Sequence, residues 1–202
     1  MFIYMIYGIR LFLIASVIGV CQTVSSVGLT KEAIFKILDG ESIEFVYQVA
    51  LIDFNGKFVV DNSYFQIDFE RPEASKFQLY FDVNQSTAGF PLATKLMLSE
   101  SVLYAKENPK ISFISNNITR LKNRFKITGM LTIKGISKPF ELEAKLNMKN
   151  ENNFENISFL NFHIFADIFR SDYGASGYLG LVGDKIVLNS NIKLSPDNRE
   201  LK

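Results

Sequence analysis

Hydrophobic and polar residues alternate most regularly in residues 124–146, in two arms separated by a segment that contains glycine. One face of the first arm would carry Phe125, Ile127, Gly129, Leu131 and Ile133. One face of the second arm would carry Phe140, Leu142, Ala144 and Leu146. A period of two places alternate side chains on opposite faces of a sheet, so each arm predicts a strand with one apolar face. Residues 135–138 predict the turn, and Pro139 is acceptable as the first residue of the second strand. We therefore expect an antiparallel hairpin with one face in water.

The same alternation predicts further strands along the chain: Ser42–Ala50, Lys57–Phe69, Lys76–Asn84, a strand ending near Ile118, Ile157–Ile168 and Lys185–Leu194. Asn55-Gly56 predicts a hairpin turn, because both residues accept positive φ. Leucines at near-helical spacing in Pro91–Asn108 predict one helix or two short helical turns. Asn147–Asn156 is polar without periodicity and predicts a loop.

These elements predict an all-β fold of about eight mostly antiparallel strands with one short helical insertion. A sheet of that size avoids exposed edges by closing into a barrel. An eight-stranded barrel is either filled by its own side chains or holds one ligand, and composition does not decide between the two.

Residues 1–26 have the order of a secretory signal peptide. Arg10 is their only charged residue, an apolar run follows it, and small residues lie near Ser26. We expect cleavage after Ser26 and a barrel domain over residues 27–202; an uncleaved membrane anchor is the alternative. Cys21 is the only cysteine of the chain, so the cleaved protein would have neither a disulfide nor a thiolate site.

Charge and composition exclude several functions. Of 22 Lys and Arg against 21 Asp and Glu, only Arg10 lies in the leader, so the remaining domain is neutral. Neutrality argues against nucleic-acid binding, which requires a basic surface. His163 is the single histidine and no carboxylates have metal-ligand spacing, so we predict no metal site and no catalytic triad. His163 is expected to lie in a strand with its hydrogen bond satisfied.

Arg170 and Asp172 are expected to pair with each other and hold a glycine-containing loop at the barrel mouth, or to contact a ligand head group.

Three segments resemble a known family. They are GMLTIKGISKPFELEA at residues 129–144, NPKISF at residues 108–113 and FRSDYG at residues 169–174. With them the chain resembles the YceI-like family of bacterial polyisoprenoid-binding proteins from about residue 39 to residue 194. Glu41 stands where the family usually has histidine, so no role of that histidine carries over.

The resemblance implies a lipocalin-like antiparallel barrel that binds an isoprenoid, quinone-like or other long-chain amphiphilic lipid without catalysis, in the periplasm or as a secreted protein. No other cofactor is implied. The apolar faces of the strands would then form the ligand-binding wall, which we predict to contain Phe45, Tyr47, Phe65, Ile67, Phe77, Leu79, Phe81, Phe113, Phe125, Ile127, Leu131, Phe140, Leu142 and Phe162.

Two alternatives stay open at this stage. The first is a filled, ligand-free barrel that acts as an interaction module at the membrane, with the leader retained. The second is an enzyme that acts on the lipid, which would need His163 or a carboxylate inside the cavity. Membrane contact is expected to be transient or through an uncleaved leader, and a homodimer is left open.

Overall fold

The structure of the 202-residue chain is a computed structural model that describes residues 32–38, 41–147 and 159–197. These ranges contain nine strands, β1 (Glu32–Ile37), β2 (Ser42–Val49), β3 (Ile52–Asp68), β4 (Lys76–Thr87), β5 (Lys110–Leu121), β6 (Arg124–Ile133), β7 (Ile136–Leu146), β8 (Leu160–Phe169) and β9 (Lys185–Pro196). The helical elements described are α1 (Pro91–Met97) and two 3₁₀ turns, η1 (Pro72–Ala74) and η3 (Arg170–Tyr173).

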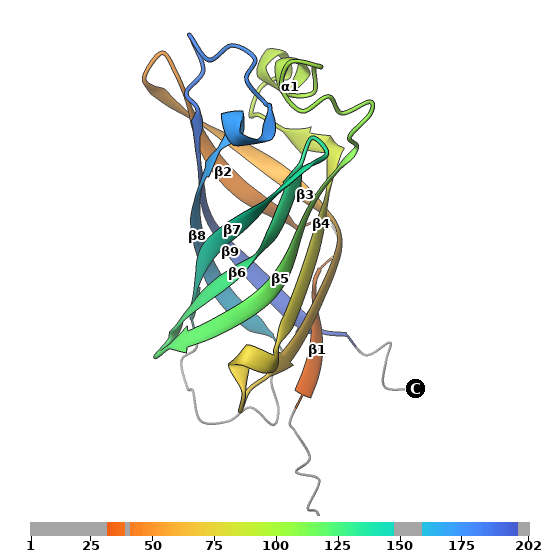
Figure 1. The fold of residues 1–202 in the computed structure, drawn as a ribbon, viewed down its shortest axis with the longest axis vertical. Helices are drawn as coiled ribbons and strands as arrows, with labels where there is room; N and C mark the ends of the chain where they lie inside the picture. The colour runs from red at the N-terminus through yellow and green to blue at the C-terminus, as the bar shows by residue number, and fades with distance from the viewer. Residues whose placement is uncertain (1–31, 39–40, 148–158, 198–202) are drawn as a thin grey trace, which may run out of the picture.

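The described strands form one antiparallel sheet that closes on itself (Figure 1). The order is β1-β3-β2-β9-β8-β7-β6-β5-β4, and β3 pairs with β4 to close the barrel. β1 and β2 share one place, because each pairs with β3 on one side and with β9 on the other. The nine strands therefore occupy eight places. This confirms the predicted all-β antiparallel barrel of about eight strands with a short helix.

The predicted hairpin at residues 124–146 is confirmed as β6 and β7, but its turn is shorter than predicted. Ile133 pairs directly with Ile136, so the turn is Lys134-Gly135, with φ of 50° and 74°. Positive φ at both central residues matches the right-handed twist of the flanking strands. Pro139 lies inside β7 opposite Met130, so the prediction that it begins the strand was wrong.

The predicted turn at Asn55-Gly56 was also wrong. Both residues lie inside β3, and the turn between β2 and β3 is Ala50-Leu51, with φ of 47° and 71°. Gly56 pairs with Phe45 across the two strands, and a Cβ at Gly56 would collide with the Phe45 ring. Glycine at residue 56 thus makes room for an aromatic ring and does not form a turn.

The segment predicted to be helical lies at one end of the barrel (Figure 1). Pro91 begins α1, as expected for proline in the first helical turn. The helix ends at Met97, and turns continue the chain to β5. Met97, Leu103 and Ala105 are buried in the core. β5 and β6 are joined at the opposite end of the barrel, where η1 also packs against β5.

Several predictions lie outside the described residues. They are the signal peptide at residues 1–26, most of the polar loop Asn147–Asn156, and the first residues of the strand predicted at Ile157–Ile168. In the part of the chain that is described, no helix has the length and apolar character needed to cross a membrane.

Candidate functional site

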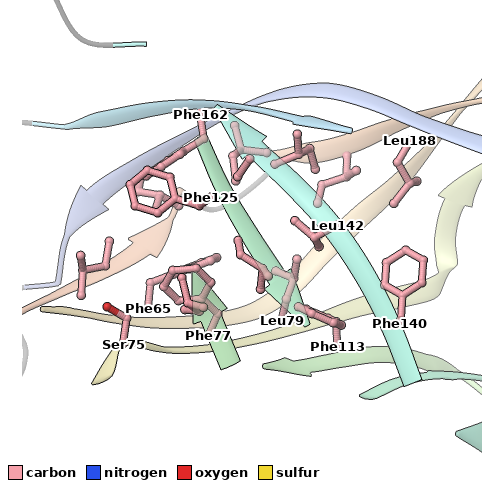
Figure 2. Close-up of a pocket in the computed structure, with 18 of the residues that line it drawn as sticks. Phe65, Ser75, Phe77, Leu79, Phe113, Phe125, Phe140, Leu142, Phe162 and Leu188 are labelled. Atoms are coloured by element: carbon pink, nitrogen blue, oxygen red, sulfur yellow. The ribbon is translucent and has the colours of Figure 1, made fainter. Parts of the chain in front are cut away.

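The interior of the barrel contains an apolar cavity of about 120 Å³. Its wall comes from the inward-facing residues of the strands, because alternate side chains of each strand point to the barrel axis. Figure 2 shows Ser75, Phe65 and Phe77 toward one end of the cavity, and Phe140 and Leu188 toward the other. A single water molecule needs roughly 10–15 Å³ by the same measure. The barrel is therefore hollow, which the sequence alone left undecided.

Most of the predicted wall residues lie on the cavity. These residues are Phe65, Ile67, Phe77, Leu79, Phe81, Phe113, Phe125, Ile127, Leu131, Phe140, Leu142 and Phe162. They come from β3 to β8, so the fold brings together side chains that are up to about a hundred residues apart in the chain. Their contact with a ligand stays a prediction.

Phe45 and Tyr47 lie outside the cavity wall, although both were predicted to form it. Phe45 stacks on Phe58 with ring centroids 4.4 Å apart. The Tyr47 hydroxyl donates a hydrogen bond of 2.8 Å to the Ala88 carbonyl, next to α1. Burial raises the pKa of Tyr47. Both side chains are buried in the layer that closes the α1 end, above the cavity. Alternation correctly predicted that both side chains face the barrel interior. It does not predict how far along the barrel axis each of them lies.

Further wall residues were absent from the predicted set: Ile43, Phe58, Asp68, Phe69, Pro72, Ser75, Ile111, Ile118, Arg120, Ile133, Ala144, Leu146, Leu160, Ile164, Ile168, Leu188, Ile192 and Leu194. Many of them follow the same alternation, such as Ile133 and Leu188, and could have been found by extending each apolar face along its whole strand. The polar residues and the residues of η1 give no such signal.

The polar side chains of the wall are Asp68, Ser75 and Arg120. Asp68 ends β3, Ser75 follows η1, and Arg120 lies at the end of β5 beside the β5–β6 turn. η1 packs against β5, and η1 and the β5–β6 turn both lie at the end of the barrel opposite α1, so all three residues line that end of the cavity. The cavity is consequently amphipathic along its length, apolar through the barrel and polar at its η1 end.

Asp68 is almost completely buried and fully bonded. Its carboxylate accepts the backbone N–H groups of Glu70 and Arg71, and the Arg71 guanidinium at 3.0 and 3.1 Å. The hydrogen bond from the Arg71 backbone holds the pKa of Asp68 below its usual value, against the opposing effect of burial. Ser75 Oγ accepts the Asp68 N–H at 3.0 Å. Asp68 therefore shapes the η1 turn as an ionised carboxylate, and is unsuited to act as a general acid.

Arg170 holds the loop after η3 at the α1 end of the barrel. It is 7% exposed, and its guanidinium donates to the carbonyls of Ala175, Gly177, Val182 and Gly183. The predicted pairing of Arg170 with Asp172 was wrong, because Asp172 accepts a hydrogen bond of 2.9 Å from Lys138. Arg170 thus holds the glycine-containing loop through backbone carbonyls, and it does not line the cavity.

The described residues offer little for catalysis. His163 alternates with the inward-facing Phe162 and Ile164, so it points away from the cavity, and its Nδ1 lies 3.2 Å from Asn191 Oδ1. This agrees with a strand histidine whose hydrogen bond is satisfied. Among the described residues, no three His, Cys, Asp or Glu side chains are grouped to hold a metal ion.

The fold and the site define a class of protein, namely a closed antiparallel β-barrel with a hollow apolar interior. Residues 37–194 match the model of the YceI-like domain, which is most of the chain, and the protein belongs to this family. Protein YceI of Salmonella newport is 30% identical over 94 residues, which make up 46% of each chain. The chain thus matches about half the length of these curated relatives.

Solved structures share the fold. The chain superposes on BcnA of Burkholderia cenocepacia with a TM-score of 0.65 and 19% identity, covering 76% of this chain and 94% of BcnA. It superposes on a polyisoprenoid binding domain from Saccharophagus degradans, implicated in plant cell wall breakdown, with a TM-score of 0.59. That match has 11% identity and covers 83% of this chain and all of the other.

Proposed function

We propose that the protein binds one isoprenoid or similar long-chain amphiphile in its barrel, without catalysis, and carries, stores or sequesters it in the periplasm. The observation that carries this proposal is the distribution of polar side chains on the cavity wall. Among the described residues of the wall, the polar side chains lie at the η1 end and the rest of the wall is apolar. An amphiphile with one long chain and one polar head has the same distribution.

Physical chemistry supports a tightly held chain. Each Å² of apolar surface removed from water contributes about 25 cal/mol, and a chain inside the barrel would be surrounded by apolar side chains. The wall is built on strands that are hydrogen-bonded on both sides, so the cavity is largely preformed. Membership of the YceI-like family and the polyisoprenoid binding domain from Saccharophagus degradans, which shares the fold, point to the same ligand class.

Native mass spectrometry of the mature protein from its own host tests the proposal. We expect a mass higher than that of the polypeptide by one lipid, and solvent extraction followed by lipid mass spectrometry would identify the class. A ligand-free mass that stays unchanged after incubation with polyprenyl lipids would contradict lipid binding. The measured polypeptide mass also tests cleavage after Ser26.

A second candidate is docking on a membrane partner without a lipid in the barrel, with the leader at residues 1–26 retained as a membrane anchor. The observation in its favour is a group of exposed apolar side chains at the α1 end, where Leu51 is 90% exposed, and Leu92 on α1 is 63% exposed. Leu51 lies in the turn between β2 and β3, and the loop that contains Leu181 packs against this turn, since the Ala50 N–H donates a hydrogen bond to the Leu181 carbonyl. Association of the native protein with membranes that survives carbonate washing would favour this candidate over a free periplasmic carrier.

A further inference from the structure

We propose that the η1 end of the cavity is a subsite for an acidic head group, a phosphate or carboxylate, and that Arg120 supplies its positive charge. This inference rests on the proposed function, because it names the head and the orientation of the amphiphile in the same cavity. The hydrocarbon chain would run from Arg120 along the barrel toward Phe140 and Leu188.

The positions of the polar wall residues indicate the end of the cavity at which a charged head group would lie. Asp68, Ser75 and Arg120 all lie at the η1 end, while Phe140 and Leu188 lie at the far end of the cavity in Figure 2. Beyond them the α1 end is closed by buried aromatic side chains, including Phe45 and Tyr47. Placing a charged head against that apolar layer would be costly, so the head belongs at the η1 end.

The hydrogen bonds at this end show which groups are available. Both carboxylate oxygens of Asp68 are occupied by Arg71 and backbone N–H groups. Ser75 Oγ accepts the Asp68 N–H, and a hydroxyl oxygen that accepts one bond still has its own hydrogen to donate. Ser75 therefore offers a neutral donor at the wall, which suits an acceptor-rich head group.

Arg120 supplies the charge at this position. Arg120 lines the cavity, and its side chain is also exposed to solvent. Its Nε donates to the Lys122 carbonyl at 2.9 Å, and the guanidinium lies 5.9 Å from the centre of the Phe125 ring, another wall residue. In the described ranges Arg120 forms no ion pair with a carboxylate. Its guanidinium therefore lies near a wall residue, with no carboxylate partner among the described residues.

Both basic and acidic side chains lie near Arg120. Lys122 and Arg124 follow it in the β5–β6 turn, and Arg124 has only a long contact of 3.9 Å with Glu143. Asp68 is neutralised by Arg71. Glu73 in η1 is an exposed acid that opposes this effect. Glu70, two residues after Asp68, is a second exposed acid at this end. The decisive charge is therefore that of Arg120 itself, whose planar guanidinium matches phosphate and carboxylate oxygens in pairs.

A matched pair of amphiphiles tests the subsite, with geranylgeranyl phosphate and geranylgeraniol differing only in the head. The delipidated mature protein is loaded with Nile red, and each amphiphile is titrated as a competitor below its micelle concentration. We expect the phosphate to bind at least about tenfold more tightly than the alcohol, as for a partly exposed charge-assisted hydrogen bond. Arg120→Gln should remove this preference and leave alcohol binding within about twofold.

Two controls make the outcome specific. Arg124→Gln removes a neighbouring charge that is outside the cavity wall, and should retain the preference for the phosphate. Inorganic phosphate alone should not displace Nile red, because the head group without its chain gains no apolar burial. Displacement by inorganic phosphate that depends on Arg120 would show a free-anion site and overturn the lipid head-group assignment.

The failures of the two proposals are distinguishable. Equal affinity for phosphate and alcohol, or an unchanged preference in Arg120→Gln, would overturn the acidic head-group subsite and leave lipid binding intact. Binding of neither amphiphile would overturn both proposals. Circular dichroism of Arg120→Gln should match the wild type, since the side chain is exposed.

Discussion

Arg170 is the residue on which the loop at the α1 end depends. Its buried guanidinium satisfies four backbone carbonyls, so Arg170→Met would leave several of them without a partner. We expect the free energy of unfolding to fall by roughly 2–4 kcal/mol, measured by urea denaturation. Asp172→Asn is the matched control. It removes only the exposed contact with Lys138 and should cost less than about 0.5 kcal/mol. A larger loss in Asp172→Asn than in Arg170→Met would contradict the conclusion that the loop depends on the carbonyl contacts of Arg170.

Asp68 gives the protein a pH dependence of known sign. Its pKa is held low in the folded state, chiefly by the Arg71 backbone N–H. The folded state therefore binds this proton less readily than the unfolded chain, so the contribution of Asp68 is present above the unfolded pKa of about 3.9 and is lost as the pH falls through the folded pKa. We expect the Tm of the wild type to fall on acidification below about pH 4, and Asp68→Asn to weaken that dependence. Identical pH profiles for both proteins would contradict the effect.

Residue-level prediction from the sequence succeeded where a residue's role follows from alternation. Inward-facing residues such as Phe125 and Leu142 were identified because every second residue of a strand faces the same side. The position of Tyr47 above the cavity depends on strand stagger, which alternation does not encode. Asp68 and Arg120 were missed because a polar residue at a strand end has the same sequence pattern whether it meets a cavity or solvent.

At the scale of elements, the β2–β3 hairpin has an unfavourable turn. Ala50 and Leu51 both adopt positive φ, and Leu51 is 90% exposed, so no burial offsets the strain at that leucine. Leu51→Gly should raise the free energy of unfolding by roughly 0.5–1 kcal/mol in urea denaturation, because glycine adopts this conformation without a Cβ clash. Leu51→Ala is the control, since it removes the side chain and keeps the Cβ. Equal stability of the two variants would show that backbone strain at residue 51 is negligible.

Turn placement was the weakest part of the prediction for elements. Asn55-Gly56 has the strongest local turn sequence in this region, yet it lies inside β3 because Gly56 must accommodate the Phe45 ring. The β6–β7 turn was predicted at residues 135–138, but it is Lys134-Gly135, so Gly135 is its second residue and not its first. Local propensity locates a hairpin to within a few residues, and cross-strand packing then fixes the register.

At the scale of the whole molecule, the sequence predicted a closed barrel but not its hollow interior. The strands were recognisable one by one, and closure follows from the need to pair every edge. β1 and β2 share one place in the sheet, which no local pattern reveals. Whether eight strands enclose a cavity depends on the summed volume of inward side chains at each level of the barrel. Small residues such as Ala144 at the wall leave space that larger ones would fill.

Filling the cavity should separate folding from ligand binding. Ala144 is 4% exposed and lies on the cavity wall, between Phe125 of β6 and Ile164 of β8. Ala144→Phe would place a ring in existing space, so we expect stability within about 1 kcal/mol of the wild type, whereas overpacking a solid core costs about 1–3 kcal/mol. The lipid retained on purification, quantified by native mass spectrometry, should fall at least about tenfold, because the chain and the ring need the same volume.

The control for this experiment is Ile114→Phe on the outer face of β5, where Ile114 is 44% exposed. It adds similar bulk outside the barrel and should leave the bound lipid unchanged. Full retention of lipid by Ala144→Phe would place the ligand elsewhere, and severe destabilisation would mean that the interior has no room for it. Loss of lipid from a stably folded Ala144→Phe protein, together with retention by Ile114→Phe, would instead locate the hydrocarbon chain inside the barrel, because only the first substitution changes the free volume there.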